Sequence, residues 1–467
     1  MNSLAMQVRY RLSGRGCAWV FRAALVVAVS ACGAHGGTNE WANPLGGDLL
    51  ESTNWNPVGV PFTNDVAIFR PLSQTNTFAV STVSDLAMGS VVVDGASIEL
   101  QLSGYTLAVD GGILVTNGGG AMLRSGLLSS SELGIVGASA GLAGGAAIDV
   151  AGYPGDGGLV MHDRGLLSVV DGGGSLTGRV LWAVMGADEV ARIRVEGEGT
   201  LFRPHDPMGP MGHSGAFLEV GANPNPGMNP YYDALGTAVV ELAGGAAIDG
   251  TVILYDRGVL RFVDGGGQVT GGLTMTGGTV HVEGGSLVEL GYMDSSPGSD
   301  FWIDPNGRAR FSGQVTGSAD FRGGGAVEFL GGFSPGNSPA AVSFEGNVLL
   351  GSNNILTLEL GGLVAGSEHD QLMVDGNLAF GGTMEVSLID LFDPAAGDAF
   401  RLFQFGSSSN TFASISLPAL DGGLAWDTTR LYSEGWLSVL AIPEPRPIIV
   451  AIGLLIGVWG LRRTRRS

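Results

Sequence analysis

Lysine is absent from the 467 residues, and cysteine occurs only at Cys17 and Cys32. A chain without lysine cannot build a phosphate-binding loop of the kind whose lysine contacts the phosphates. Because both cysteines lie within the first 32 residues, no disulfide can cross-link the rest of the chain. The fold of that remainder must therefore be held together by packing and hydrogen bonds.

Positive charge is scarce. All 23 basic residues are arginines, and nine of them lie before residue 23 or after residue 445. The segment between these ends has 14 arginines against 44 acidic residues, which gives it a net charge near −30. Such a charge argues against nucleic acid or an anionic membrane surface as a partner. It suits a soluble surface outside the cell.

Motifs for catalysis and cofactor binding are missing. The stretch Gly212-His213-Ser214-Gly215 lacks the spacing of a nucleophile elbow. No helix is expected after the glycines at 172–174, so they do not form a dinucleotide-binding fingerprint. His205 and His213 share a proline-interrupted loop with no third ligand at a fixed spacing. We therefore expect no cofactor and no bound metal.

Paired acidic residues are the one pattern that fits catalysis. Asp188-Glu189 and the pair Asp163 and Asp171 offer the two carboxylates that glycoside chemistry uses. With 44 acidic residues in the chain, pairs of this kind also arise by chance. We expect a protein that is not an enzyme.

Glycine, in contrast, is abundant at 80 residues, well above the average of about 7%. The glycines separate short runs of Val, Leu, Ile, Ala and Thr, such as 90–93, 106–109 and 279–283, which end at Asp-Gly or Gly-Gly. Glycine and aspartate tolerate the backbone of a tight corner. Helical periodicity is missing between residues 40 and 440, so many short strands with frequent turns predict an all-β chain.

Two motifs recur within the chain. Residues 144–149 and 244–249 share the sequence Gly-Gly-Ala-Ala-Ile-Asp, 100 residues apart. The segment 163–174, which ends in Asp-Gly-Gly-Gly, recurs 93 residues later at 256–267. The extra loop 152–158 of the first copy accounts for the difference in spacing.

A repeated unit that varies in length only in its loops is typical of a solenoid. We therefore predict a Gly-rich parallel β-helix, or β-solenoid, over residues 80–333, with the internal repeat at 144–178 and 244–271. A series of β-sandwiches is the alternative.

Aromatic residues precede the solenoid in the segment 35–79. Because the open end of a solenoid has to be covered, we predict that Trp41, Trp55 and Phe69 cap the first coil. The alternative role for the two tryptophans is stacking on sugars. The order of these aromatic motifs resembles the start of autotransporter-like surface proteins built from β-strand repeats.

The C-terminal tail combines a Pro-Glu-Pro motif, an apolar run and a cluster of arginines. A helix over the apolar run 448–461 would be about 21 Å long, which is short for a hydrocarbon core of about 30 Å. Arginines after the run keep that end in the cytoplasm. We predict a short membrane helix that serves as a transient anchor. The arginines of this anchor are Arg462, Arg463, Arg465 and Arg466.

This arrangement resembles the PEP-CTERM sorting signal of Gram-negative bacteria, with Pro443, Glu444 and Pro445 as the recognition motif. The resemblance implies that an exosortase-type protease-transpeptidase processes the tail 441–467 and passes the protein to the cell surface. Ile442 stands where valine is commoner in that signal.

The segment 334–440 has longer strands and fewer turns. Its motifs Ser334-Pro335-Gly336-Asn337-Ser338-Pro339 and His369-Asp370-Gln371-Leu372 resemble the segment before the sorting signal in many PEP-CTERM proteins and in autotransporter passengers. We expect this C-terminal β region to finish and cap the solenoid, with Trp426, Leu431 and Trp436 in its core.

The N-terminus has the layout of a secretory signal peptide, because four arginines precede the apolar stretch 23–31. We predict a signal peptide over residues 1–34, cleaved near Ala31 or Ala34. The box Val29-Ser30-Ala31-Cys32 also fits lipidation, so a lipidated Cys32 is the alternative.

Two functions fit these features. The first is a structural or adhesin-like protein that is exported through the inner membrane to the cell surface or matrix and associates with exopolysaccharide. The second is a β-helix protein that binds or degrades polysaccharide. A degrading enzyme for acidic polysaccharide needs a groove with basic residues, and scattered arginines would argue against it. The candidates are Arg164, Arg192, Arg194 and Arg257.

Overall fold

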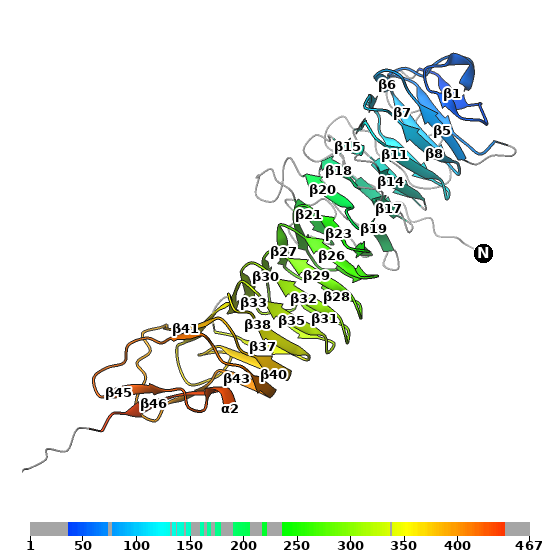
Figure 1. The fold of residues 1–467 in the computed structure, drawn as a ribbon. Helices are drawn as coiled ribbons and strands as arrows, with labels where there is room; N and C mark the ends of the chain where they lie inside the picture. The colour runs from blue at the N-terminus through cyan, green and yellow to red at the C-terminus, as the bar shows by residue number, and fades with distance from the viewer. Residues whose placement is uncertain are drawn as a thin grey trace, which may run out of the picture.

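The chain winds into a long coil of short parallel strands, coloured from blue to orange in Figure 1. This computed structural model describes residues 36–72, 77–130, 133–136, 138–143, 146–150, 159–162, 166–169, 173–178, 190–205, 217–221, 236–336 and 339–443. The helical segments within these ranges are the short turns η2 (Ser52–Asn54) and α2 (Leu431–Glu434). The predicted all-β parallel β-helix is confirmed.

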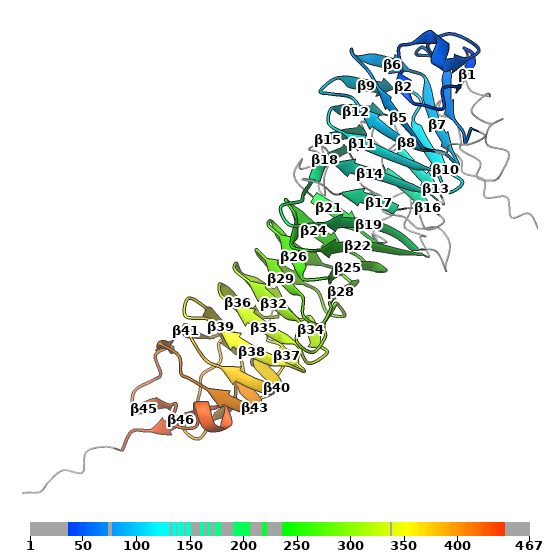
Figure 2. The ribbon, with the colours of Figure 1, turned by 45° about the vertical axis from the view of Figure 1, so that its right-hand side comes forward.

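A regular coil contributes one strand to each of three faces. Val259 pairs with Thr279 and Leu287 with Arg308, so successive coils lie 20 and 21 residues apart. Faces 1 and 2 belong to one 27-stranded sheet, and face 3 is described as sheets of seven and nine strands. Figure 2 shows the faces from a second side.

Face 1 consists of the following strands: β5 (Thr77–Ser81), β8 (Ser97–Gln101), β11 (Gly120–Arg124), β14 (Ser139–Ala143), β17 (Leu166–Val169), β19 (Val190–Glu196), β22 (Thr237–Ala243), β25 (Gly258–Val263), β28 (Thr279–Val282), β31 (Asp300–Ile303), β34 (Asp320–Arg322), β37 (Ala341–Phe344), β40 (Gln371–Ala379) and β43 (Phe403–Ser409). The short β2 (Gly47–Asp48) pairs with β5.

Face 2 consists of the following strands: β6 (Leu86–Met88), β9 (Thr106–Val109), β12 (Leu127–Ser130), β15 (Ala146–Val150), β18 (Gly173–Gly178), β20 (Leu201–His205), β23 (Ala246–Ile248), β26 (Gly266–Val269), β29 (Leu287–Leu290), β32 (Arg308–Phe311), β35 (Ala326–Phe329) and β38 (Asn347–Leu350). The second half of β40 continues this face beyond β38.

Face 3 begins with β1 (Thr38–Trp41), β4 (Val66–Phe69), β7 (Ser90–Asp94), β10 (Ile113–Thr116), β13 (Leu133–Val136) and β16 (Leu159–His162). Its second part contains β21 (Phe217–Val220), β24 (Thr251–Leu254), β27 (Gly272–Met275), β30 (Met293–Ser295), β33 (Val315–Gly317), β36 (Gly332–Pro335), β39 (Ile355–Leu360), β41 (Thr383–Leu388) and β44 (Ser414–Ser416). This parallel register excludes the β-sandwich alternative.

The internal repeat corresponds to a block of three coils. In the motif 163–174, Leu166 stacks on Arg192, then on Val239 and then on Val259, which is its partner in the sequence alignment. In the motif 144–149, the stack from Ala146 leads through Gly174 and Phe202 to Ile248, two residues beyond the aligned Ala246. A shift of two keeps the same side chains inside.

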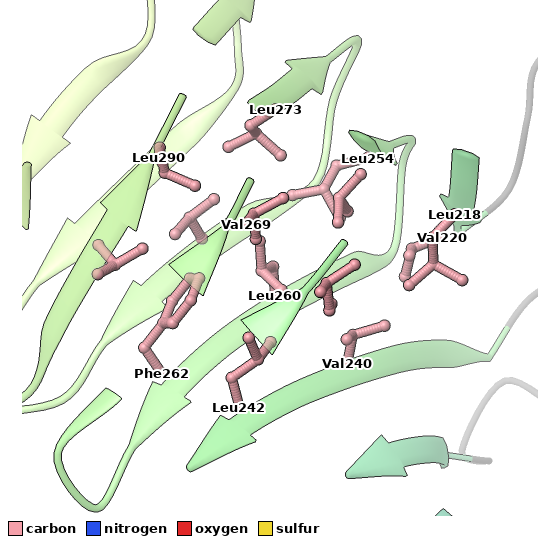
Figure 3. Packing of buried hydrophobic residues seen from close by; sticks show 14 of the residues in the cluster. Leu218, Val220, Val240, Leu242, Leu254, Leu260, Phe262, Val269, Leu273 and Leu290 are labelled. Atoms are coloured by element: carbon pink, nitrogen blue, oxygen red, sulfur yellow. The ribbon is translucent and has the colours of Figure 1, made fainter. Parts of the chain in front are cut away.

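The core follows from the alternation of side chains along each strand. In β28, Val280 and Val282 are buried while Thr279 and His281 are partly exposed. Leu260 and Phe262 of β25 point to the same interior as Leu242 of β22, as Figure 3 shows. Stacking places like residues above one another, so the coil interior is a continuous apolar column.

Two of the three glycines at 265–267 lie against the backbone of neighbouring coils. Gly265 and Gly266 have φ angles of +98° and +83°, which side-chain-bearing residues rarely adopt. A Cβ on Gly266 would lie 2.1 Å from Leu287 O of the next coil. A Cβ on Gly267 would lie 2.4 Å from Ala246 O of the preceding coil. Gly265 is therefore required for its backbone conformation and Gly267 for the close approach of the preceding coil. Gly266 is required for both its backbone conformation and the close approach of the next coil.

The N-terminal end is closed by an aromatic plug, as predicted. Trp41, Trp55 and Phe69 are buried, and their ring centroids lie 5.1 to 5.6 Å apart. Strand β3 (Trp55–Asn56) folds back antiparallel on β1 and covers the edge of face 3. Because both tryptophans are inaccessible, they cannot stack on sugars.

The C-terminal end is closed by a small antiparallel sheet of β42 (Ala399–Arg401), β46 (Trp436–Ala441) and β45 (Leu424–Asp427). Leu431 of α2 is fully buried, while Trp426 and Trp436 are only partly buried. The parallel stack extends past the predicted limits 80–333, from β1 to β44. The segment 334–440 thus completes the stack before it caps it.

Of the predicted sorting motif, only Pro443 falls within the described chain, where it is exposed. The signal peptide 1–34, Cys32, Glu444, Pro445, the membrane helix 448–461 and its four arginines lie outside it. Among the residues that are described, no helix has the length and apolar character to cross a membrane.

Candidate functional site

The interior of the coil offers little room for a ligand. A void of about 30 Å³ lies in the N-terminal coils, lined by apolar side chains such as Phe69, Leu107 and Leu128. The residues that line this void are all apolar, so a polar ligand would find no side-chain hydrogen-bond partner there. The outer surface is therefore the place to look for function.

On face 1, one line of outward-facing side chains is in register from coil to coil. We call these residues the outer row: Arg194, Glu241, Arg261, His281, Trp302 and Arg322. Stacked strands lie about 4.8 Å apart, so neighbours in this row are within side-chain contact. Sequence positions up to 128 residues apart thus form one strip.

The first half of the outer row is an ion-pair network around Glu241. Arg194 donates to one oxygen of this carboxylate, and Arg261 Nη1 lies 3.3 Å from the other. Arg261 also donates to Glu283 Oε1 at 2.5 Å, in the turn of the next coil. The arginines cover Glu241 so completely that only 4% of its side chain is exposed.

Hydrogen bonding to Glu196, with further bonds and charge interaction at Glu241, raises the pKa of Arg194 above its ordinary value despite burial. A similar pairing occurs on face 2, where Arg310 donates to Glu328 Oε2 at 2.9 Å and to Glu289 Oε1 at 2.7 Å. In both places a single arginine ties adjacent coils together. The arrangement serves cohesion of the stack.

The second half of the outer row contains an exposed aromatic residue. Trp302 lies between His281 and Arg322, and 42% of it is exposed. Its indole Nε1 donates to Asp304 Oδ1 at 3.0 Å, and His281 Nε2 lies 3.2 Å from the same oxygen. Burial alone would raise the pKa of Asp304, but the bonds from His281 and Trp302 hold it below its ordinary value.

Two more buried titratable groups lie at the junction with the C-terminal cap. Asp370 accepts the backbone N–H groups of Ala340 and Glu359, each at 2.8 Å. Burial raises the pKa of Asp370 to about 7, against the effect of those two bonds. His369 is also buried, and its Nδ1 lies 3.1 Å from Gly362 O. Both residues join strands and face no solvent, so we assign them a structural role.

The predicted arginine candidates divide between the ion-pair network and a turn. Arg192 and Arg194 are brought together on β19, with Arg192 Nε 3.9 Å from Glu241 Oε2. Arg257 lies in a turn with a φ of +63°. Arg164 lies outside the described residues. Because Arg194 is engaged by carboxylates of the chain itself, this group is poorly suited to holding an acidic polysaccharide.

The remaining candidates fall largely outside the described residues. Asp163, Asp171, Asp188 and Glu189 lie outside them, as do Asp206 and His213. His205 ends strand β20. Within the described part of the chain, no group of three or more His, Cys, Asp or Glu side chains is placed to hold a metal ion.

Sequence reasoning missed Glu241, Arg261 and Trp302. A signal for Trp302 exists in the strand Asp300-Phe301-Trp302-Ile303, because burying Phe301 and Ile303 turns Trp302 outward. No comparable signal exists for Glu241, whose partners come from two other strands, β19 and β25. In comparisons with known proteins, the chain matches no family model and no curated protein sequence.

Proposed function

We propose that the protein is an exported structural or adhesin-like component of the cell surface or extracellular matrix, associated with exopolysaccharide. The observation that carries this proposal is the capped rod, a stack of coils closed at both ends by buried aromatic and apolar side chains (Figure 1). A rod of this kind separates its two ends by a fixed distance. It leaves three long faces free for contacts.

The distribution of charge supports a role outside the cell. The segment between the two arginine-rich ends has a net charge near −30, which favours dispersion in water over contact with anionic surfaces. Its arginines are used where coils meet, as at Arg261 and Arg310. The rod is thereby stabilised without any disulfide.

The junction between cap and tail supports processing by an exosortase-type enzyme. Strand β46 ends at Ala441, and Ile442 N donates to Gly423 O at 2.7 Å. The exposed Pro443 follows directly. The Pro-Glu-Pro motif therefore begins two residues after β46 of the cap, and cleavage near it releases the described rod.

Cell fractionation with a matched pair of variants tests this proposal. In the source cells, the Glu444→Ala variant is expected to stay in the inner-membrane fraction with an unprocessed C-terminus, as read by mass spectrometry. The wild type and the control variant Asp421→Ala, changed at an exposed cap residue, should reach the surface and become accessible to added protease. Equal surface exposure of all three proteins would refute processing at this motif. Retention of the wild type in the cytoplasm would refute export.

A further inference from the structure

We propose that the surface around Trp302 is a binding site for neutral glycan chains, with the indole as the stacking platform for one pyranose ring. The inference rests on the proposed surface role only for the supply of glycan. Binding itself is a property of the purified protein.

Trp302 is 42% exposed, whereas the other tryptophans of the described chain are buried or only partly exposed. Trp41 and Trp55 are buried in the N-terminal plug, Trp426 packs on Phe400, and Trp436 lies within 6.0 Å of the guanidinium carbons of Arg401 and Arg430. Among the described residues, neither an aromatic ring nor an arginine stacks on Trp302. An exposed tryptophan presents a large apolar ring together with a polar N–H group, and this combination suits contact with a partner that has both kinds of surface.

The ring is also held in one orientation before any ligand arrives. Its Nε1 is bonded to Asp304, which the nearby His281 also contacts. Gly323 of the next coil also lies against the indole, because an added Cβ there would come 2.8 Å from the indole nitrogen. The lack of a side chain at Gly323 thus leaves room for the ring. Prior ordering of this kind reduces the entropy lost on binding.

Polar groups able to bond sugar hydroxyls lie on β31, the strand of Trp302, and on the neighbouring β34. Arg322 Nη2 lies 3.2 Å from both Asp300 Oδ1 and Asp320 Oδ2, and all three side chains remain between 42% and 47% exposed. Carboxylates accept and guanidinium groups donate hydrogen bonds, so these groups match both roles of a hydroxyl. Glu345 lies beside them and accepts the N–H of Gly323 at 2.7 Å.

The charge of this rim selects among glycans. Four carboxylates belong to this surface, those of Asp300, Asp304, Asp320 and Glu345, with Arg322 as the one permanent cation among the named groups. Hydrogen bonding to Asp320 raises the pKa of Arg322, so this guanidinium stays charged. Its positive charge is already balanced by the carboxylates of Asp300 and Asp320. A uronate would meet net repulsion here, whereas a neutral pyranose meets none.

Affinity electrophoresis of the purified protein without its signal peptide and tail residues 444–467 tests the site. The gels contain hydroxyethylcellulose, laminarin or yeast mannan as neutral probes, and polygalacturonate as the acidic probe. We expect retardation by at least one neutral polymer and none by polygalacturonate. Trp302→Ala should weaken that retardation about tenfold, and Trp302→Phe should retain part of it because a smaller aromatic face remains.

Tyr105→Ala is the matched control, because Tyr105 is similarly exposed at 40% but lies in a turn of the N-terminal coils. Its retardation should equal that of the wild type, and all variants should keep the wild-type circular dichroism and thermal midpoint. Wild-type binding to none of the neutral polymers overturns the inference, as does unchanged binding of Trp302→Ala or stronger binding to polygalacturonate. The cell-fractionation experiment described above tests the surface location of the protein independently of glycan binding.

Discussion

Alanine substitutions at the three consecutive glycines 265–267 separate two costs, that of a left-handed backbone and that of a steric clash with a neighbouring coil. Gly265→Ala adds only the cost of a left-handed backbone, because nothing lies within 4 Å of the new Cβ. This cost is about 1–2 kcal/mol. Gly267→Ala has no such backbone cost, but its Cβ would lie 2.4 Å from Ala246 O.

Gly266→Ala combines both costs and should be the most damaging of the three. Its Cβ would lie 2.1 Å from Leu287 O, and contacts below 3.0 Å are essentially never observed for real Cβ atoms. Relief requires a shift of about 1 Å between coils, when Leu287 N already lies 3.3 Å from Gly265 O. We expect a loss of about 3–5 kcal/mol, the range of severe core substitutions. For Gly267→Ala we expect about 2–3 kcal/mol.

Hydrogen exchange measured by mass spectrometry is the appropriate assay, because a stack of coils opens locally rather than as one unit. Gly266→Ala should increase exchange in residues 279–311, the side on which its Cβ collides. Gly267→Ala should increase exchange in residues 237–254, the opposite side. Gly265→Ala should show a small change confined to the turn. Equal and symmetric effects for all three variants would refute the assignment of one glycine to each neighbouring coil.

Three further predictions concern the ion-pair network, the cap junction and the plug. Glu241→Gln should lower the free energy of unfolding by about 2 kcal/mol, since it removes the buried negative charge that partly exposed Arg194 and Arg261 share. Glu196→Gln, at an exposed partner, should cost less than about 0.5 kcal/mol in the same denaturant titration. The pKa of Asp370 is about 7 in the folded protein and 3.8 in the unfolded chain. The free energy of unfolding should therefore fall as pH rises from about 4 to 7, by at most about 1.4 kcal/mol per pH unit. Asp370→Asn should abolish this slope, and an unchanged slope would contradict the prediction. Trp55→Ala should cost about 3–5 kcal/mol locally and expose the N-terminal coils, but not the C-terminal cap, to limited proteolysis.

The architecture could be predicted because its determinants are local. Asp-Gly and Gly-Gly corners mark the turns, and alternation within strands of four residues marks the inside of the coil. The register of Leu166 over Val259 was already present in the repeated sequence. The aromatic plug followed from the need to close an open end.

The candidate site could not be predicted in the same way. The outer row takes one residue from each coil, and the spacing between its members varies with the intervening loop. Arg194 and Glu241 are 47 residues apart, whereas Glu241 and Arg261 are 20 apart. The later members, from Glu241 to Arg322, follow every 20 or 21 residues, but this spacing does not show which side chains face outward or which groups they bond. The outward direction of Trp302 could be inferred from its strand, but its place beside Asp304 and Arg322 could not.

The three-coil span of the internal repeat has a consequence for how such a rod changes over evolution. Successive coils add about 4.8 Å each, so duplicating a block of three lengthens the rod by about 14 Å. The new block joins its neighbours through the same backbone bonds, while the plug and the cap are untouched. The length of the rod therefore changes in steps of whole coils. Selection for a longer or shorter protein can act by copying or deleting blocks, while the sequences of the plug and the cap stay the same.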